Sequence, residues 1–250
     1  MVTFIIQART GSTRLPNKIV KPFCNGKSIL GIIINKLKQI PYTRIIIATS
    51  ENPNCDIIES FAKDANIDCY RGSENNVLKR FIMAAEKFNT EKIIRICSDN
   101  PFLELQSLMN LVSFAQKYGK DYDYSSFNID GTPSIKTHYG FWAEYVTINA
   151  LKKISKLTNE SAYLEHVTNY IYTHPQQFNI YWHDTPSALC THRNIRLTID
   201  TEADFLTAQS IYSETEGKGQ FYTIDEMIKY LDNHPSYYEQ MNSQIRQNTK

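Results

Sequence analysis

The 250-residue sequence predicts an α/β protein with a mainly parallel, doubly wound sheet. Short apolar, β-branched runs typical of buried strands alternate with amphipathic segments of helical length from residue 2 to about residue 118. Strands joined through helices are usually parallel, with right-handed crossovers. After residue 120 this alternation of strands and helices becomes irregular, which indicates a smaller β/α elaboration of the same sheet.

The first half supplies four strands and four helices. We expect strands at 2–8, 44–50, 68–72 and 91–101. We expect helices at 29–40, 56–65, 77–88 and 105–118. Ser28 stands directly before the first helix, as an N-cap residue whose hydroxyl can accept a backbone hydrogen bond.

The second half is rich in aromatic and β-branched residues with turn signals. We expect helices at 147–157, 160–173, 202–213 and 224–233, and strands at 177–184 and 195–200. We interpret 1–235 as one domain, with 125–185 as the elaboration, and 236–250 as a polar tail that frays.

Composition bounds the function. The 27 basic and 26 acidic residues nearly cancel, which argues against nucleic acid or an anionic membrane as partner and makes any anion site local. The five cysteines show no metal-ligand spacing, and no signal peptide or apolar run of roughly 18 residues is present. We therefore expect a cytoplasmic protein whose cysteines fill the core.

The loop IQARTGSTRLPNK follows the first strand and is unusually cationic. Arg9, Arg14 and Lys18 can hold phosphate oxygens, Gly11 allows close backbone approach, and Ser12 adds a donor. Ligands bind at the carboxyl ends of strands in open α/β sheets, so a nucleoside triphosphate suits this loop. The alternative is a solvated polar turn.

Two aspartates each end a buried strand, Asp99 in RICSDNP and Asp200 in LTIDTEAD. Carboxylates at neighbouring strand ends can share Mg²⁺, which bridges to phosphate oxygens. The alternative makes each an ordinary cap, Asp200 for the helix at 202–213 and Asp99 for the turn at Pro101.

Further polar residues are weaker candidates. Arg71 and Ser73 end the third strand and can face the same crevice, whereas Arg80 on the next helix is a solvated arginine on the simplest interpretation. His166 lies mid-helix in YLEHVTNY, where a structural histidine is common. Glu144, inside the aromatic run FWAEY, is a candidate substrate contact.

Five segments together resemble a known family. QARTGSTRLPNK, YRGSENNVLKRF, RICSDNPFLE, YLEHVTNYIY and RLTIDTEADF follow one another between Val2 and about Phe205. In order and spacing they resemble the spore coat polysaccharide biosynthesis protein F family, which is similar to the CMP-Kdo and CMP-acylneuraminate synthetases.

The resemblance implies a Rossmann-like nucleotidyltransferase fold, with Mg²⁺ on Asp99 and Asp200. It implies catalytic roles for Arg9, Lys18, Asp99 and Asp200. It implies nucleotide contacts from Ala8, Arg9, Gly11, Ser12, Arg14, Lys18, Arg71, Ser73 and Arg95. Glu144 and His166 are then expected on the substrate side.

Four positions depart from the family pattern. Thr10 replaces a common methionine, Asn17 a common glycine, Asn75-Asn76 an acidic pair, and SDN at 98–100 a more usual GDC. These changes leave the loop cations and Asp99 in place. The change at Asn75-Asn76 puts the ligand contacts of that segment in question.

The sequence thus predicts a Mg²⁺-dependent cytidylyltransferase. It would transfer CMP from CTP, or a nucleoside monophosphate from another NTP, to an acidic sugar or a phosphorylated acceptor. Pyrophosphate would be released. The alternatives are a glycosyltransferase that uses a nucleotide-sugar and a catalytically idle nucleotide-binding protein. The aromatic-rich region 125–185 and the related dimeric synthetases predict a homodimer.

Overall fold

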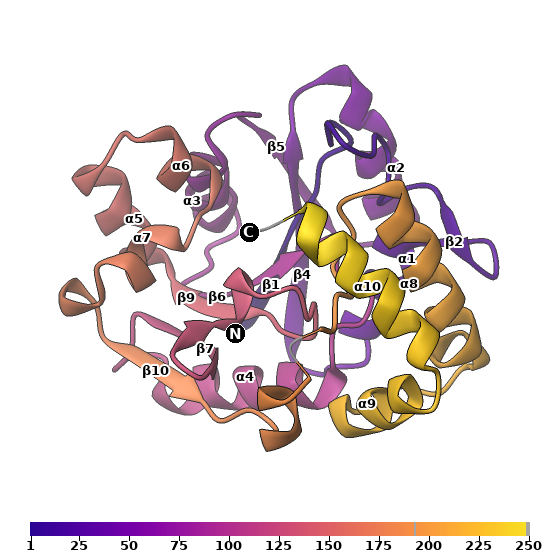
Figure 1. Ribbon diagram of the computed structural model, residues 1–250. Helices are drawn as coiled ribbons and strands as arrows, with labels where there is room; N and C mark the ends of the chain where they lie inside the picture. Colours follow the sequence, from indigo (N-terminus) through magenta and orange to yellow (C-terminus); the bar gives the residue numbers. More distant parts are fainter. Residues whose placement is uncertain (193, 249–250) are drawn as a thin grey trace.

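The computed structural model describes residues 1–192 and 194–248. A central sheet carries helices on both faces (Figure 1). The strands are β1 (Val2–Gln7), β2 (Pro22–Cys24), β3 (Lys27–Ser28), β4 (Thr43–Ser50), β5 (Asp68–Gly72), β6 (Lys92–Cys97), β7 (Tyr124–Ile129), β8 (Thr132–Pro133), β9 (Glu144–Thr147) and β10 (Ile180–His183).

The helices begin close to where the hydrophobic period predicts them. They are α1 (Ile29–Leu37), α2 (Asp56–Asp64), α3 (Val77–Lys87), α4 (Leu105–Tyr118), α5 (Ile148–Leu157), α6 (Ser161–Glu165), α7 (Asn169–Thr173), α8 (Glu202–Glu214), α9 (Ile224–Asp232) and α10 (Pro235–Gln247). The Ser28 side chain accepts from the Gly31 backbone N–H at 3.2 Å, which confirms it as the N-cap of α1.

The sheet runs in the order β10-β7-β9-β6-β1-β4-β5, with β8 paired to β7. β1 is parallel to both β4 and β6, β4 is parallel to β5, and β10 is parallel to β7. β9 is antiparallel to β6 and β7. The prediction of a mainly parallel sheet is confirmed, and β7, β9 and β10 extend it rather than form a sheet of their own.

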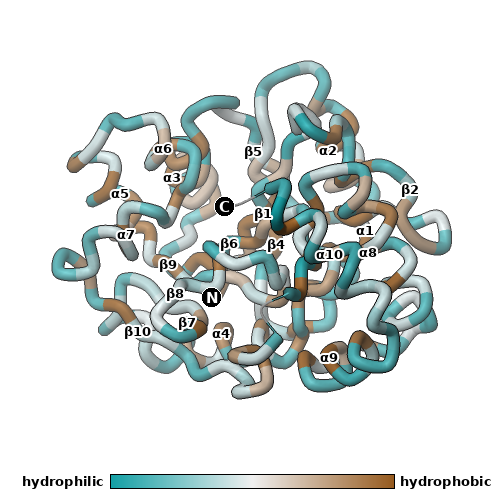
Figure 2. The backbone as a smooth tube through the Cα atoms, in the orientation of Figure 1, coloured by the Kyte–Doolittle hydropathy of each residue, from teal (hydrophilic) through white to brown (hydrophobic). Residues whose placement is uncertain are grey.

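Alternate side chains of the central strands face opposite layers. Phe4 and Ile6 of β1 belong to a core shared with α1, α2, α4, α8 and α9. Ile5 belongs to a second core shared with α3, α5 and α7. The central strands appear as brown segments inside a largely teal outer layer (Figure 2). Both faces are therefore buried, as a doubly wound sheet requires.

The prediction of a strand at 195–200 is wrong. These residues adopt no regular strand, because their backbone groups bond to loops and not to a neighbouring ladder. The N–H of Leu197 donates to His138 O, and that of Ile199 donates to Asp99 O. The apolar run is buried as predicted, and its end lies near Asp99, because Lys18 contacts both Asp99 and Asp200.

The expected helix at 160–173 is two short helices. α6 ends at Glu165, and α7 begins at Asn169. His166 is the C-cap of α6, with φ −98° and ψ 71°, and so does not lie mid-helix as predicted. The break places Thr168 in a buried position between the helices.

The C-terminal segment also differs from expectation. Its described part forms α10, which packs on α8 and α9 and buries Met241 in the core. Met241 gives this otherwise polar helix a docking contact; residues 249–250 lie outside the described part. The division into one domain, 1–235, and a tail stays an expectation.

The cysteines are free thiols. Cys24 and Cys55 are buried, as a role in core packing predicts, whereas Cys190 is exposed. No helix in the described ranges combines the length and the apolar composition needed to cross a membrane.

Candidate active site

The loop after β1 is folded tightly onto its own backbone. Thr10 O accepts from the N–H groups of Ser12, at 2.9 Å, and Asn17, at 3.0 Å. The buried Thr10 hydroxyl donates to Asn54 O at 3.1 Å, so the residue that departs from the family pattern anchors the loop to α2's entry. Asn17 has φ 61°, a left-handed conformation that glycine or asparagine adopts most readily.

Lys18, from the end of this loop, lies between the two predicted metal ligands. Its ammonium donates to Asp99 Oδ2 at 3.0 Å and is 3.8 Å from Asp200 Oδ1. It also donates to Ile199 O. Three residues far apart in the sequence thus meet at the carboxyl edge of the sheet, as predicted.

Asp200 is held from both sides. Arg14 contacts its Oδ1 at 3.0 Å, and the wholly buried Arg196 contacts its Oδ2 at 3.1 Å. Its alternative role as helix cap does not apply, because Thr201 caps α8 in a capping box with Asp204. The Asp200 carboxylate is therefore available for cations.

Arg196 is fixed by Asp204. Its Nε and Nη2 bond to the two Asp204 carboxylate oxygens at 2.7 and 2.8 Å. Burial raises the pKa of Asp204, but the hydrogen bonds and charge of Arg196, with the backbone N–H groups of Asp200 and Thr201, outweigh it and lower the pKa below its usual value. The sequence reasoning missed Arg196; its place in RLTID was the available signal.

The remaining loop residues face different elements. Arg9 reaches across to α6 and pairs with Glu165 at 2.9 Å. Arg14 also contacts Asn248, at the end of α10, at 3.1 Å.

A Cβ at Gly11 would lie 3.3 Å from the Glu74 carboxylate, so the loop also approaches the segment after β5. Ala8 is buried and donates its N–H to Ala48 O, and the Ser12 hydroxyl accepts from the Leu15 N–H at 3.4 Å.

Arg71 does not join the Lys18 cluster. Its guanidinium pairs with Asp56 and Glu59 of α2, at 2.7 and 2.9 Å, and its assignment as a nucleotide contact stays a prediction. The Ser73 hydroxyl accepts from the Asn76 N–H at 3.1 Å, and Asn76 caps α3. Asparagine and aspartate are equally good caps, so the departure at Asn76 preserves the local structure.

Arg80 is buried, which corrects its interpretation as a solvated arginine. It donates to Ser73 O at 2.6 Å and supports the turn after β5. Burial, together with the charge of Arg9, lowers the pKa of Arg80 to about 10.

Arg95 and Glu144 form a buried network that reaches Gln7, the last residue of β1. Arg95 donates to Glu144, to Thr168 and to Gln7. Glu144 also accepts from Tyr124, and burial followed by the charge of Glu144 raises the pKa of that phenol well above its usual value. Arg95 and Glu144 are both buried, and their predicted ligand contacts stay predictions.

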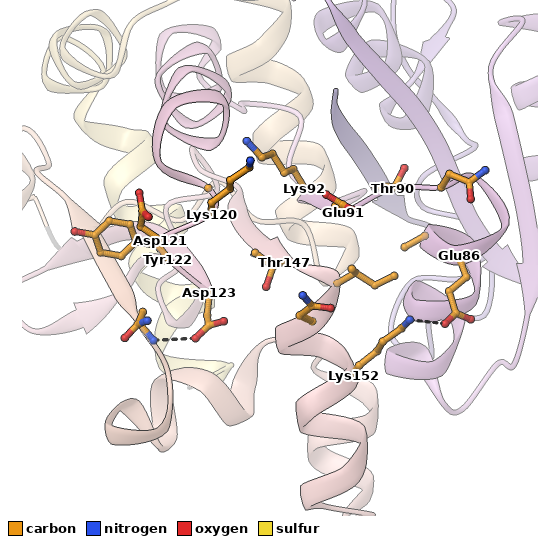
Figure 3. Close-up of a pocket in the computed structure, with 16 residues that line it drawn as sticks. Glu86, Thr90, Glu91, Lys92, Lys120, Asp121, Tyr122, Asp123, Thr147 and Lys152 are labelled. Carbon is orange, nitrogen blue, oxygen red and sulfur yellow. Dashed lines mark hydrogen bonds and ion pairs between the residues drawn. The ribbon is translucent and has the colours of Figure 1, made fainter.

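A hollow of about 600 Å³ lies at the opposite edge of the sheet (Figure 3). It is bordered by residues at the start of β6, at the end of β9 and before β7 and β10, among them Lys92, Thr147 and Asp123. Lys18, Asp99 and Asp200 are not among its lining residues. The chemistry-bearing groups therefore do not coincide with this hollow.

The described residues contain no cluster of three or more His, Cys, Asp or Glu side chains suited to a metal. The carboxyl edge offers two carboxylates and, from the loop, two arginines and a lysine. Such a set suits a polyanion together with a divalent cation that retains waters.

Comparisons with known proteins show the family of this chain. The family model for cytidylyltransferases matches residues 3–248. The chain is 32% identical over 240 residues to spore coat polysaccharide biosynthesis protein SpsF of Bacillus subtilis, covering 94% of this chain and 95% of that protein.

Solved structures share the fold. A cytidylyltransferase from Leptospira borgpetersenii superposes with a TM-score of 0.83 at 27% identity, covering 95% of this chain and 96% of that one. CMP:2-keto-3-deoxy-manno-octonic acid synthetase, solved with CTP, has a TM-score of 0.63 at 12% identity, covering 85% and 98%. The chain belongs to the cytidylyltransferase family and is a nucleotidyltransferase with a Rossmann-like fold.

Proposed function

We propose that this protein is a metal-dependent cytidylyltransferase that transfers CMP from CTP to an acidic sugar of a surface polysaccharide and releases pyrophosphate. The observation that carries the proposal is the meeting of Lys18 with Asp99 and Asp200 at the carboxyl edge, beside Arg14. Charges of both signs at the carboxyl edge support binding of a metal–triphosphate complex there.

The carboxylates fit Mg²⁺. This ion commonly takes one or two protein carboxylates and completes its shell with waters and phosphate oxygens. Asp99 Oδ2 and Asp200 Oδ1 both lie within 4 Å of one ammonium nitrogen, so a single cation can serve both. Mg²⁺ held there would neutralise negative charge on the phosphate oxygens.

The chain's own residues supply position and charge. Arg14 and Lys18 would hold the β- and γ-phosphates, and Arg9 would hold a further phosphate oxygen after leaving Glu165. The oxygen of an acceptor hydroxyl attacks the α-phosphorus in line, and its proton passes to solvent. The bond to the β-phosphate oxygen breaks, and pyrophosphate leaves with that electron pair. These fixed donors act as the leaving charge develops, so no protein nucleophile is needed.

The substrate class rests on relatives. One relative is named for spore coat polysaccharide biosynthesis, and one structural neighbour is a synthetase of a CMP-linked sugar acid. Three cations at the crevice suit an acidic or phosphorylated acceptor alongside CTP. The free thiols of all five cysteines fit a reducing compartment such as the cytoplasm.

Pyrophosphate release tests the proposal. The four common NTPs are each incubated with Mg²⁺ and a panel of sugar acids and sugar phosphates, and pyrophosphate is measured with coupled enzymes. We expect release only with CTP and an acidic acceptor. Release of free CMP or UDP from nucleotide-sugars instead would indicate a glycosyltransferase, and no turnover despite CTP binding would indicate an idle binder.

We also propose a homodimer formed through 125–185. Here β10 is the sheet's edge strand, and Tyr181 on it is 40% exposed beside Phe114. An exposed edge strand with apolar side chains is commonly buried against another chain or element. Light scattering at micromolar concentration should give twice the chain mass; a monomer would contradict the proposal.

A further inference from the structure

The Gln7 side chain occupies a distinctive place as the last residue of β1, directly before the cationic loop. Its Oε1 accepts from Arg95 Nε at 3.1 Å and Nη2 at 3.0 Å. A guanidinium only donates hydrogen bonds, so the oxygen must face Arg95 and the NH₂ group must face the other way. Within the described residues, the Gln7 Nε2 atom has no hydrogen-bond partner.

Arg95 is itself immobilised. Its Nη1 bonds to Glu144 and to the Thr168 hydroxyl, which in turn donates to Glu144. Arg95 and Glu144 are 5% and 2% exposed, so this ion pair is shielded from solvent. A charged group bonded to Oε1 also polarises the amide, which makes its free N–H₂ a stronger donor.

The strand order places the amide on one side of β1. Gln7 shares its face of β1 with Ile5, which packs against α3, α5 and α7. Arg95 is on β6, which separates β1 from β9, so the amide is held on the side of the elaboration. The segment after β5 lies on the other side of β1, beyond β4. The resemblance implies nucleoside contacts from the segment after β5, which leaves the side of Gln7 to the second substrate.

We propose that Gln7 Nε2 is a specificity-determining donor to the carboxylate of the acceptor. The inference rests on the proposed function, because it assigns the acidic acceptor to one side of that same site. A carboxylate only accepts hydrogen bonds, so a donor with fixed orientation favours it, whereas a hydroxyl can bond to either end of an amide. Arg95 and Glu144 act as positioning residues for this amide.

Gln7→Glu separates positioning from recognition. The new carboxylate still accepts from Arg95, so thermal unfolding should occur within a few degrees of the parent. Its second oxygen now presents negative charge to the acceptor. We expect binding of an acidic acceptor to weaken about tenfold to a hundredfold, because a charge-assisted hydrogen bond is replaced by repulsion. Gln39→Glu, the same change at an exposed position, is the matched control.

Calorimetry provides the test without turnover. The sodium salts of 2-keto-3-deoxy-manno-octonate and N-acetylneuraminate are titrated into each protein with CMP and Mg²⁺ present, and CTP is titrated separately. The parent and the Gln39→Glu variant should bind at least one acid equally. Gln7→Glu should lose that binding while its affinity for CTP stays within about threefold.

Three results would overturn the inference: no sugar acid bound by the parent, equal sugar-acid binding by Gln7→Glu and the parent, or equal losses for CTP and the sugar acid. Failure of the proposed function is distinct. Sugar-acid binding without pyrophosphate release would reject the cytidylyltransferase while keeping the role of Gln7. Pyrophosphate release with a sugar phosphate alone would keep the cytidylyltransferase activity and reject the role of Gln7.

Discussion

The two edges of the sheet carry similar side chains to different effect. At the amino edge, Lys152 pairs with Glu86 between exposed positions, and Lys92 donates to carbonyls at the end of α4, all around a hollow of about 600 Å³ (Figure 3). At the carboxyl edge, Lys18, Asp99 and Asp200 converge with Arg14 and the buried Arg196. Convergence of partly buried charges, and not the volume of a hollow, indicates the site.

The largest expected effect is loss of turnover at the carboxyl edge alone. Asp99→Asn and Asp200→Asn each remove a proposed metal carboxylate at constant volume, and we expect rates to fall on the order of a thousandfold, about 4 kcal/mol of barrier. Steady-state pyrophosphate release measures this. Glu86→Gln, at the amino edge, should retain the parent rate. Rates of both aspartate variants within about tenfold of the parent would remove the metal assignment.

The buried network supplies the next contrast. Asp204→Asn leaves Arg196 incompletely paired, and breaking a buried ion pair costs about 3–5 kcal/mol of the free energy of unfolding. Glu86→Gln breaks an exposed pair and should cost about 0–1 kcal/mol. Urea denaturation of both variants measures the difference, and equal costs would show that the Asp204 pair is not structural.

The same pair predicts a pH dependence. The pKa of Asp204 is lower in the folded state, so its contribution is complete above the unfolded value of about 3.9 and is lost as pH falls through the folded value. The stability gap between the parent and Asp204→Asn should therefore narrow as the pH falls below about 3.9. A gap that widens in that range would contradict the assigned direction.

A smaller effect concerns Arg14. Its planar fork suits two phosphate oxygens, so Arg14→Ala should weaken CTP binding by about 1.5–3 kcal/mol. Arg14→Lys should recover only part of this, because an ammonium cannot bond to two oxygens in one plane. Calorimetric titration of both variants decides it, and full recovery in the lysine variant would argue for simple charge.

The smallest effect concerns the backbone of the loop. Asn17 has φ 61°, so Asn17→Gly should change stability by less than about 1 kcal/mol, whereas Asn17→Val should lose about 1–2 kcal/mol or more. Thermal unfolding of the two variants measures this. Equal stability for both would show that the left-handed conformation is not required in solution.

Much of this arrangement was predictable because the residue that follows a strand lies at a known edge of the sheet. Buried apolar runs identified β1, β4 and β6, and the carboxyl ends of parallel strands meet at one edge, so Lys18 and Asp99 were expected together. Asp200 joined them although 195–200 is not a strand. Burial there was readable from the sequence, but which backbone partners the run would find was not.

Partners of buried polar residues were the main failure. Arg196, Gln7 and Arg80 appear in the sequence as ordinary polar residues, and only folding shows which carboxylates, amides and carbonyls they meet. Glu144 was singled out correctly as unusual, but its partners are Arg95 and Thr168 and not solvent. Local periodicity carries no information about such contacts, which join residues 49 and 24 positions apart.

The most direct test of the central claim is a pair of calorimetric titrations on Lys18→Ala, with Lys152→Ala from the amino edge as control. If the carboxyl edge holds a metal–triphosphate complex, Lys18→Ala should weaken CTP binding in Mg²⁺ about tenfold to a hundredfold and CMP binding little, because only CTP carries the β- and γ-phosphates. Lys152→Ala should leave both unchanged. Equal losses for CTP and CMP in Lys18→Ala, or a loss of CTP binding in Lys152→Ala, would contradict the account.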